Sequence, residues 1–337
     1  MKTVRVKKTT AVLLIMVLLF TMLTGCSKNE VGAPDEGNDS VTEIVKVAAL
    51  NGPTGMAMVK LMDQTDKYEV STFQAPTDVT GKLISGEVDV AAVPSNLAAV
   101  LYNKTEGQIV AVSPVAMGVL YILGNKVGAA DVADLAGKTI VASGQGGTPE
   151  YVLQKILQQA GLEIYKDVQV EWLANHSEVN AKLQSDEGIV AMLPEPFVST
   201  ALSMGNKDVT TIFDMNVLWE EATGQGLPMG VLVAQKTFVE EREEDLEVLM
   251  SDLRESVSFI NGATDAAAQY IVDKGFMGKA EIAKAAIPNC HIVLYAGDGG
   301  LELGTAIMKT FNETLFEMSP AAVGGKLPGD DLYYVGK

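Results

Sequence analysis

The sequence predicts an α/β protein made of two lobes, each a mainly parallel sheet flanked by helices. The 337 residues suit two lobes of ordinary size better than one small domain. Short apolar segments alternate with segments of helical periodicity from Ile44 to Phe213, which is typical of parallel βαβ units. Two similar apolar segments, Gly118–Leu123 (GVLYIL) and Met229–Ala234 (MGVLVA), bracket the second half of this alternation. We interpret them as strands that cross between the lobes.

The elements before Gly118 form a first series. We expect strands at Ile44–Leu50, Tyr68–Phe73, Val88–Val93 and Ile109–Ser113, and helices at Met56–Met62, at Pro76–Gly86 and from Pro94 onward. Pro94 and Ser95 suit a helix N-terminus, where proline and small hydroxyl residues are favoured.

The second series follows the first crossing strand. Its expected strands are Thr139–Ala142, Val168–Leu173, Gly188–Leu193 and Val209–Phe213, and its expected helices are Thr148–Ala160, Glu178–Gln184 and Pro194–Leu202. The predicted first lobe is therefore residues 43–117 and 235–337, and the predicted second lobe is residues 118–234, crossing strands included.

The C-terminal part is expected to be mostly helical, at Leu246–Ile260, Thr264–Asp273, Lys279–Ala286 and Gly299–Phe316, followed by a loose tail at Pro328–Lys337. The charged segment Glu240–Glu247 (EEREEDLE) is typical of a solvated helix face.

Composition narrows the class of protein. Hydrophobic residues make up 47% and aromatic residues only 6%, which favours a sizeable core of short strands and helices over an all-β sandwich. The net charge is −18, and it becomes −22 once the four cations of the first eight residues are removed with a signal peptide. Such a charge repels nucleic acid, so no nucleic-acid partner is expected.

The N-terminus resembles an export signal. Residues 1–8 are basic, and Ala11–Met22 is apolar except for Thr21, so residues 1–25 are predicted to be a signal peptide. Leu23-Thr24-Gly25-Cys26 resembles the lipobox of bacterial lipoproteins, which implies lipidation of Cys26. The alternative is a chance cysteine at the end of an ordinary signal peptide.

Residues 27–42 are polar and acidic, and with Cys26 they are interpreted as a lipidated flexible tether. The folded part is then expected at the outer face of the cell membrane, on the periplasmic side if an outer membrane exists.

Metal and cofactor chemistry is not indicated. The chain has two cysteines, Cys26 and Cys290, and two histidines, His176 and His291, and they form no cluster with metal-ligand spacing. With Cys26 lipidated, a disulfide framework is excluded, and Cys290 is interpreted as a small buried apolar residue. We expect no metal and no cofactor.

Three segments together resemble a known family. They are Asp131–Gly161 (DVADLAGKTIVASGQGGTPEYVLQKILQQAG), Gly86–Ala91 (GEVDVA) and Leu193–Phe197 (LPEPF). Their order and spacing are similar to those of ABC-importer solute-binding proteins of the nitrate, sulfonate, taurine and thiamine-pyrimidine-precursor branch, over residues 44 to 260. The first turn, Asn51–Met56, departs from that pattern, so the resemblance does not name a ligand.

The resemblance implies the two-lobed periplasmic-binding-protein type II fold, which closes like a hinge on a small molecule. It implies an ABC importer permease as partner, and a monomer is expected.

The candidate site is built from loops that follow strands and precede helices, because open α/β sheets bind ligands beyond the carboxyl ends of their strands. Helix N-termini there offer free N–H groups, and glycine lets the backbone approach a ligand. The candidate ligand-binding residues are Asn51, Gly52, Pro53, Thr54, Gly55, Ser95, Asn96, Gly146, Gly147, Thr148, Glu195 and Phe197. For Gly144–Thr148 and Asn51–Gly55, a plain tight turn remains the alternative.

The side chains of these loops favour some ligands over others. No arginine lies in them, which argues against a sulfonate or phosphate ligand. Glu195 is a candidate acceptor for an amine or a heteroaromatic N–H, and the alternative is a helix-capping role. Phe197, Trp172 and Trp219 are candidates for stacking on a planar ligand, with a core role as the more common outcome. His176 follows a strand and is a further candidate.

Three functions are compatible with these features. The first is a solute-binding protein that delivers its ligand to an ABC importer. The second is an enzyme on the same fold, since some menaquinone-pathway enzymes resemble this family. We expect no catalysis, because the loops offer Glu195 and hydroxyl groups but no Ser/His or His/Asp pairing. The third is a sensory or adhesive lipoprotein that no longer transports.

Overall fold

The computed structural model describes residues 41–262, 264–297 and 299–336, and residues from Ser40 onward form one compact unit. The predicted signal peptide, Cys26 and almost all of the predicted tether lie outside the described residues. Within the described residues, no helix combines the length and apolar character that crossing a membrane requires.

The first sheet has the strand order β2-β1-β3-β10-β4. Its strands are β1 (Val45–Leu50), β2 (Tyr68–Phe73), β3 (Val90–Pro94), β4 (Ile109–Met117) and β10 (Pro228–Gln235). Strands β1, β2 and β3 are mutually parallel, whereas β10 runs antiparallel to both β3 and β4. Four of the five strands therefore point the same way.

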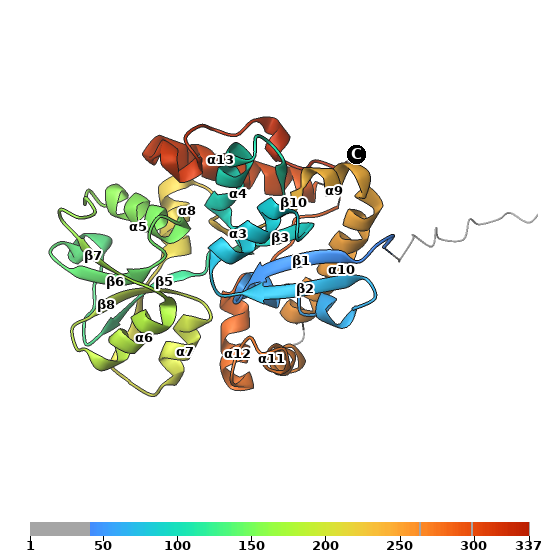
Figure 1. Ribbon diagram of the computed structural model, residues 1–337. Helices are drawn as coiled ribbons and strands as arrows, with labels where there is room; N and C mark the ends of the chain where they lie inside the picture. The colour runs from blue at the N-terminus through green and yellow to red at the C-terminus, as the bar shows by residue number, and fades with distance from the viewer. Residues whose placement is uncertain (1–40, 263, 298, 337) are drawn as a thin grey trace, which may run out of the picture. The chain divides into compact units, whose positions relative to one another are not determined.

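The second sheet repeats this plan with the order β7-β6-β8-β5-β9. Its strands are β5 (Leu120–Asn125), β6 (Thr139–Ser143), β7 (Gln169–Leu173), β8 (Val190–Pro194) and β9 (Val209–Asp214). Here β5 is the antiparallel strand, between β8 and β9. Figure 1 shows the two sheets side by side, with β5 to β8 of the second sheet in green and β1 to β3 of the first in blue and cyan. The predicted fold class, two mainly parallel sheets flanked by helices, is confirmed.

The position of β10 differs from the predicted lobe boundary. The prediction counts residues up to 234 with the second lobe, but β10 pairs with β3 and β4 of the first sheet. An apolar strand buried on both faces has the same sequence pattern in either sheet, so the sequence does not tell which sheet it joins. The chain crosses between the sheets at residues 118–119 and within residues 215–227.

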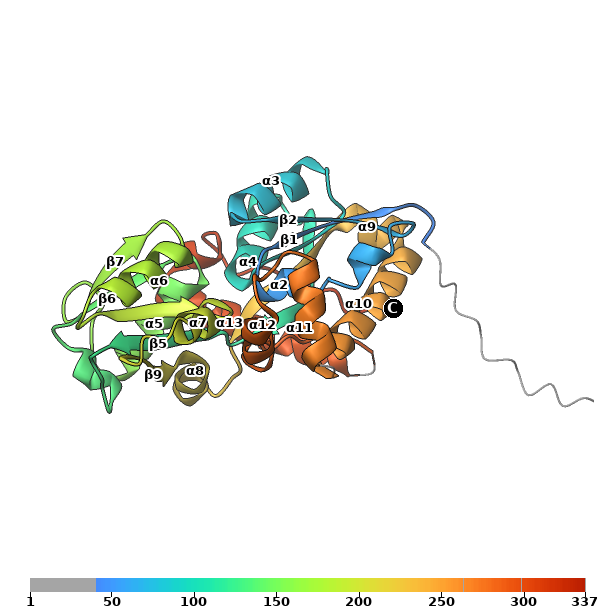
Figure 2. The same cartoon turned by 90° about the horizontal axis from the view of Figure 1, so that it is seen from below.

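The helices cover both faces of each sheet. They are α2 (Pro53–Met56), α3 (Pro76–Ser85), α4 (Ser95–Lys104), α5 (Thr148–Gln159), α6 (His176–Ser185), α7 (Phe197–Ser203), α8 (Met215–Thr223), α9 (Lys236–Glu241), α10 (Glu243–Gly262), α11 (Thr264–Asp273), α12 (Ala280–Ala286) and α13 (Gly300–Met318). Short 3-10 turns are η1 (Leu61–Asp63), η2 (Val132–Leu135), η3 (Ile287–Asn289), η4 (Pro320–Val323) and η5 (Asp330–Leu332). Figure 2 shows α11 and α12 beside α10 and α2, and α7 beside the second sheet.

Alternate side chains of each strand point to different cores, as the period of a strand requires. In β5, Leu120 and Ile122 belong to a large core that continues into the first lobe, whereas Tyr121 and Leu123 pack with α6 and α7. In β1, Ala48 lies in the large core, and Val47 packs with α10 and α11. The sheets therefore share one hydrophobic core, and each also packs against helices of its own.

Three predicted elements differ from the structure. The helix predicted at Met56–Met62 is replaced by α2 and η1, so the chain turns twice there. Helix α8, residues 215–223, was not predicted, and it contains Trp219, which is 1% exposed. The C-terminal tail is not loose, because Tyr333 forms a β-bridge with Ala111 and Leu332 is buried.

The charged segment at 240–247 is not wholly solvated. Asp245 is only 1% exposed and accepts hydrogen bonds from the backbone N and the hydroxyl of Thr42, at 2.7 and 2.8 Å. The Nε of Arg242 donates to the same carboxylate at 2.7 Å. One buried carboxylate therefore fixes the first described residues to the start of α10.

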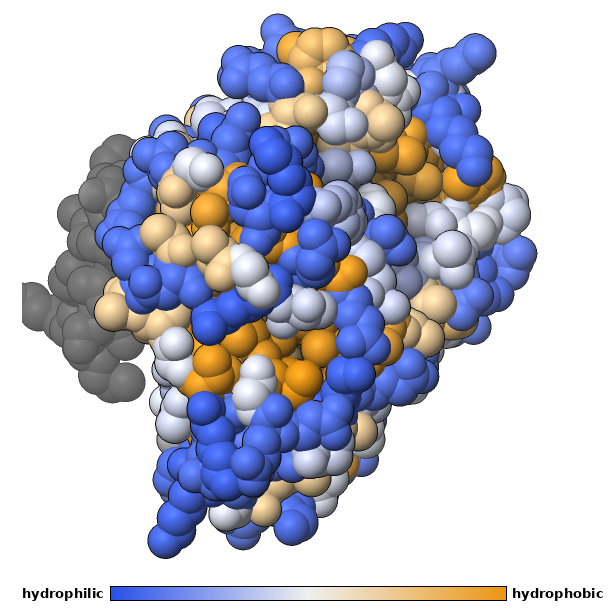
Figure 3. All heavy atoms as spheres, turned by 90° about the vertical axis from the view of Figure 1, so that its left-hand side faces the viewer, coloured by the Kyte–Doolittle hydropathy of each residue, from blue (hydrophilic) through white to orange (hydrophobic). Residues whose placement is uncertain are grey.

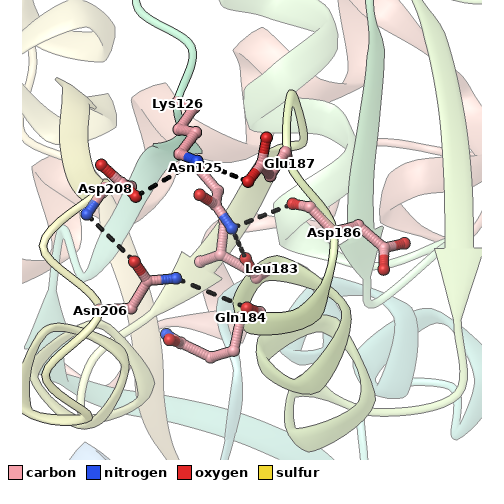
Figure 4. Close-up of polar contacts among 8 residues, drawn as sticks. All are labelled: Asn125, Lys126, Leu183, Gln184, Asp186, Glu187, Asn206 and Asp208. Atoms are coloured by element: carbon pink, nitrogen blue, oxygen red, sulfur yellow. Dashed lines mark hydrogen bonds and ion pairs between the residues drawn. The ribbon is translucent and has the colours of Figure 1, made fainter.

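A polar cluster joins three turns at the end of the second sheet where β5 finishes (Figure 4). The Asn125 amide donates to the carbonyls of Leu183 and Asp186, at 2.8 and 3.0 Å. Beside it, the Lys126 amine lies 2.5 Å from Glu187 and 3.7 Å from Asp208. Because β5 is antiparallel to its neighbours, this cluster lies at one end of the strands, and the loops that form the candidate site lie at the other end.

Candidate functional site

The candidate residues fall in four predicted loops, all of which lie where strands of the two sheets end: Asn51–Gly55, Pro94–Asn96, Gly144–Thr148 and Pro194–Phe197. Strands β1 and β3 lead into α2 and α4 in the first lobe, and β6 and β8 lead into α5 and α7 in the second. Each lobe therefore contributes two helix starts. We take these loops and the side chains around them as the candidate site.

Asn96 and Thr148 join the two lobes directly. Asn96 lies in the first turn of α4, and Thr148 is the first residue of α5. The Thr148 hydroxyl donates to the Asn96 side-chain oxygen at 3.0 Å and accepts from the Asn96 backbone N–H at 3.4 Å. Both residues are almost fully buried. The starts of α4 and α5 therefore face each other across the boundary between the lobes.

Ser95 precedes this contact and carries a polar atom without a partner. Its hydroxyl is buried and makes no hydrogen bond among the described residues. A buried hydroxyl without a partner carries a desolvation cost, so a ligand group that hydrogen-bonds Ser95 would recover it.

The glycine loop before α5 is held by an acidic residue. The backbone N–H of Gly146 donates to the Glu150 carboxylate at 2.6 Å. That carboxylate also accepts from the Tyr165 hydroxyl, to which the Trp172 indole N–H donates at 2.9 Å. Trp172 thus stabilises this loop through Tyr165 and Glu150.

The loop before α2 is packed more tightly than a ligand cradle requires. A side chain at Gly55 would meet the Phe276 ring at 2.5 Å and the Leu50 carbonyl at 2.7 Å. Thr54 is buried, and its hydroxyl donates to the carbonyl of Leu50 at 3.2 Å. Of this loop, Asn51 is exposed and Gly52 and Pro53 are partly exposed, so those three are the residues accessible to a ligand.

A serine–histidine pair lies in the second lobe. The Ser143 hydroxyl is 2.5 Å from Nδ1 of His176, and the Phe197 ring is centred 5.1 Å from the imidazole. Burial lowers the pKa of His176 to about 4, so the ring is neutral near pH 7 and Nδ1 can accept from the hydroxyl. The expectation that the loops hold no Ser/His pairing is therefore wrong. Ser143 is the last residue of β6, 33 positions from His176, and only the β6–β7 pairing brings them together.

Glu195 is buried at the start of α7. Its carboxylate accepts from the Ser199 backbone N–H at 3.0 Å, from the Ser199 hydroxyl at 2.9 Å and from the Asn289 amide at 3.5 Å. Burial raises the pKa of Glu195, and the hydrogen bonds from Ser199 and Asn289 and the charge of His291 only partly offset it. The capping role that the sequence left open is present, and it does not exclude a second role.

The same carboxylate lines a cavity of about 390 Å³. Residues of β5, α7 and β9 form one side of the cavity, and Ala285 and Asn289, from α12 and η3, form the other. The cavity lining is Tyr121, Glu195, Val198, Ser199, Leu202, Ser203, Thr211, Ala285 and Asn289. Of the twelve predicted site residues, only Glu195 lines this cavity. Its volume lies within the range of about 300–1,000 Å³ that is usual for small-molecule sites.

Other candidates have structural roles. Trp219 packs against Phe311 in the large core, with ring centres 5.7 Å apart. Cys290 is fully buried, and burial together with the nearby Glu195 raises the pKa of its thiol.

Among the described residues, no three His, Cys, Asp or Glu side chains are grouped to hold a metal ion. Figure 3 shows that hydrophobic residues on the second-lobe face are seen mainly where the surface is hollowed.

Solved structures show which fold the chain shares. An ABC transporter protein from Parabacteroides distasonis matches with 21% identity and a TM-score of 0.74, over 88% of this chain and 100% of that one. The periplasmic aliphatic sulphonate-binding protein SsuA from Escherichia coli matches with 17% identity and a TM-score of 0.67, over 88% and 93%. The periplasmic nitrate-binding protein NrtA from Synechocystis PCC 6803 matches with 15% identity and a TM-score of 0.56, over 75% and 70%. The chain thus has the periplasmic-binding-protein type II fold.

The family follows from the sequence. The model of the family described as menaquinone biosynthesis matches residues 54–318, and the chain belongs to this family. No curated protein matches the chain.

Proposed function

We propose that the protein is an extracytoplasmic solute-binding protein that holds a small organic molecule between its lobes and delivers it to an ABC importer. The observation that carries the proposal is the Asn96–Thr148 contact, in which loops of both sheets meet at the ends of their strands. Ligands of open α/β sheets bind in this position. The similarity in fold to ABC-importer binding proteins supports the same role.

The proposed location follows from the sequence. Residues 1–25 carry the features of a signal peptide, and the lipobox-like segment ending in Cys26 would attach the protein to the outer face of the cell membrane. The proposed partners are the small molecule and an importer permease, and the proposed state in solution is a monomer.

Ligand-induced closure tests this function. The compact unit, residues 40–337, is screened by thermal shift against amines, aromatic acids, pyrimidines, sulfonates and nitrate. A ligand at 100 times its dissociation constant adds about 2.7 kcal/mol to the free energy of unfolding. X-ray scattering of the bound protein should then show a smaller radius of gyration, because the closed state binds ligand better. A confirmed ligand that leaves the radius unchanged contradicts the proposal.

A second candidate function is an enzyme, and two observations favour it. The family is described as menaquinone biosynthesis, and Ser143 and His176 form a short hydrogen bond beside Phe197. A neutral imidazole that accepts from a hydroxyl is an arrangement used in general-base catalysis. Predicted export argues against it, since a biosynthetic enzyme of this kind would be expected in the cytoplasm.

Recovery of the bound molecule separates the two functions. Each ligand found in the screen is incubated with the protein for hours and analysed by mass spectrometry. A binding protein returns the ligand unchanged. An enzyme converts it, and conversion should stop in Ser143→Ala and His176→Gln while it continues in Ser185→Ala, a change at an exposed serine outside the cavity.

A further inference from the structure

The cavity beside Glu195 contains a buried carboxyl group that makes no ion pair with the described residues, and the charge of His291 offsets only part of the effect of burial on its pKa. Glu195 is 2% exposed and makes no ion pair among the described residues. No lysine or arginine lines the cavity. A carboxylate removed from water without a cation is costly, and proteins normally pair such a group.

The remaining polar groups of the cavity also favour a ligand that donates hydrogen bonds. Tyr121 and Ser199 supply hydroxyl groups, and the Asn289 amide already donates to Glu195. Apolar atoms of Val198 and Leu202 complete the wall. A molecule with a compact apolar body and one ammonium group matches this lining in charge and in polarity.

The start of α5, at the Asn96–Thr148 contact, disfavours an anionic ligand. The first N–H groups of a helix are usually free to bind an anion. At α5, Gly146 N–H is bound by the Glu150 carboxylate, Gly147 N–H by the carbonyl of Gly144 and Glu150 N–H by the carbonyl of Gly147. Pro149 has no N–H group. An oxyanion would find almost no free donor there and would face the charge of Glu150.

We propose that the cavity lined by Glu195, Tyr121, Ser199 and Asn289 binds a small organic cation, a primary amine on a compact apolar body, with its ammonium group against the Glu195 carboxylate. The inference rests on the proposed function, because it names the class of molecule held between the lobes. It sets this chain apart from the sulphonate- and nitrate-binding proteins whose fold it shares. The cavity has walls from both lobes, so an amine bound there would also hold the lobes together.

A matched series of probes tests the proposal. Binding of methylamine, isobutylamine, cyclohexylamine and benzylamine to residues 40–337 is measured by titration calorimetry. Benzyl alcohol, benzoate and benzenesulfonate are compared as a neutral and two anionic molecules of similar size. At least one amine should bind tenfold or more tightly than the alcohol or the anions, and amide NMR shifts should move at Tyr121, Ser199 and Asn289.

Two variants locate the amine. Glu195→Gln keeps the shape of the side chain and its capping of Ser199 but removes the charge, so amine affinity should fall at least tenfold. Leu202→Trp narrows the cavity from a position that is 44% exposed, so it should weaken binding without disturbing folding. The control is Glu187→Gln, an exposed glutamate of the same lobe, which should leave amine affinity unchanged.

A third variant tests the closed helix start. Glu150→Ala frees the Gly146 N–H, so affinity for benzenesulfonate or methanesulfonate should rise several-fold over that of the native chain.

The outcomes separate the two proposals. Tighter binding of the alcohol or of an anion in the same cavity overturns the amine inference and leaves the binding-protein proposal standing. Binding of no amine at 10 mM also overturns the inference, whereas the proposed function is decided by the wider screen and by closure. Amine binding that Glu195→Gln does not weaken overturns the assignment to this cavity.

Discussion

Asn96 and Thr148 exchange two hydrogen bonds across the boundary between the lobes, one from each residue as donor. Each residue belongs to the first turn of a helix that follows a strand of a different sheet. This contact therefore fixes how closely the two helix starts approach.

Thr148→Val tests that contact. Valine keeps the shape of threonine but leaves the Asn96 side-chain oxygen and backbone N–H without partners, so unfolding free energy should fall by about 1–3 kcal/mol. Chemical denaturation measures the loss. Thr105→Val removes a hydroxyl that bonds only within its own helix, and should cost clearly less. Equal losses in both variants would mean that the contact between lobes contributes nothing beyond local structure.

His176 should make stability depend on pH between about 4 and 6.5. Its folded-state pKa, about 4, lies below its ordinary value of 6.5, so in this range the unfolded chain binds a proton that the folded chain does not. Stability should therefore fall as the pH falls from 6.5, by about 1–3 kcal/mol in all. Denaturation at several pH values should show this slope, and His176→Gln should flatten it. An unchanged slope in the variant would contradict the assignment.

Glu195 should act in the opposite direction. Burial raises its folded-state pKa above the ordinary 4.5, so just above pH 4.5 the folded chain holds a proton that the unfolded chain has released. Its contribution is a loss of stability as pH rises from 4.5 through the folded-state pKa. Glu195→Gln should consequently gain stability relative to the native chain at pH 7 and match it near pH 4. The prediction is wrong if the stability of the variant, relative to the native chain, is lower at pH 7 than at pH 4.

Asp245 should be needed for stability above its low pKa. Burial alone would raise that pKa, but hydrogen bonds from Thr42 and Arg242 outweigh burial and hold it below 3.8. Its stabilising effect is therefore present above pH 3.8 and is lost as the pH falls through the folded-state value. Asp245→Ala should lower unfolding free energy by about 2–4 kcal/mol at pH 7. The exposed neighbour variant Glu244→Ala should change it by less than about 0.5 kcal/mol.

Asn125 should contribute more to stability than the Lys126–Asp208 ion pair beside it (Figure 4). Asn125 is 2% exposed, and Asn125→Ala removes the donor to the carbonyls of Leu183 and Asp186. The free energy of unfolding should fall by about 1–3 kcal/mol. Asp208→Asn removes one partner of an exposed pair whose atoms are 3.7 Å apart, at a cost near zero. Melting temperatures of the two variants decide between them, and the reverse order would refute the comparison.

The strands were predictable because each is either an apolar segment or an alternation of apolar and polar residues, bounded by turn residues. Val209–Asp214 and Tyr68–Phe73 agree with the predicted ranges to within one residue. Helix α8 was missed although its signals are present. Asp214 caps its first N–H groups and Gly224 ends it in a left-handed conformation, but the predicted strand stops at Phe213 and no element is predicted between it and Met229.

The site was less predictable than the fold. The loops were found from their position after strands, but the directions of their side chains depend on contacts distant in sequence. Glu195 points toward Asn289, 94 residues later, and Ser143 meets His176 only because β6 and β7 are neighbours. The sequence also offered no sign that Glu150 would occupy the N–H of Gly146.

The pairing of Met117, the last residue of β4, with Pro228, the first residue of β10, has a consequence for how this chain can be altered. The chain leaves the first sheet after Met117 and returns to it at Pro228, and these two residues are paired on neighbouring strands. Residues 118–227 therefore form an insertion whose two ends lie a strand spacing apart. A short turn can in principle replace the whole insertion without changing a single strand pairing of the first sheet. Recombination can likewise exchange one such insertion for another, and with it half of the candidate binding surface, while the first lobe stays the same.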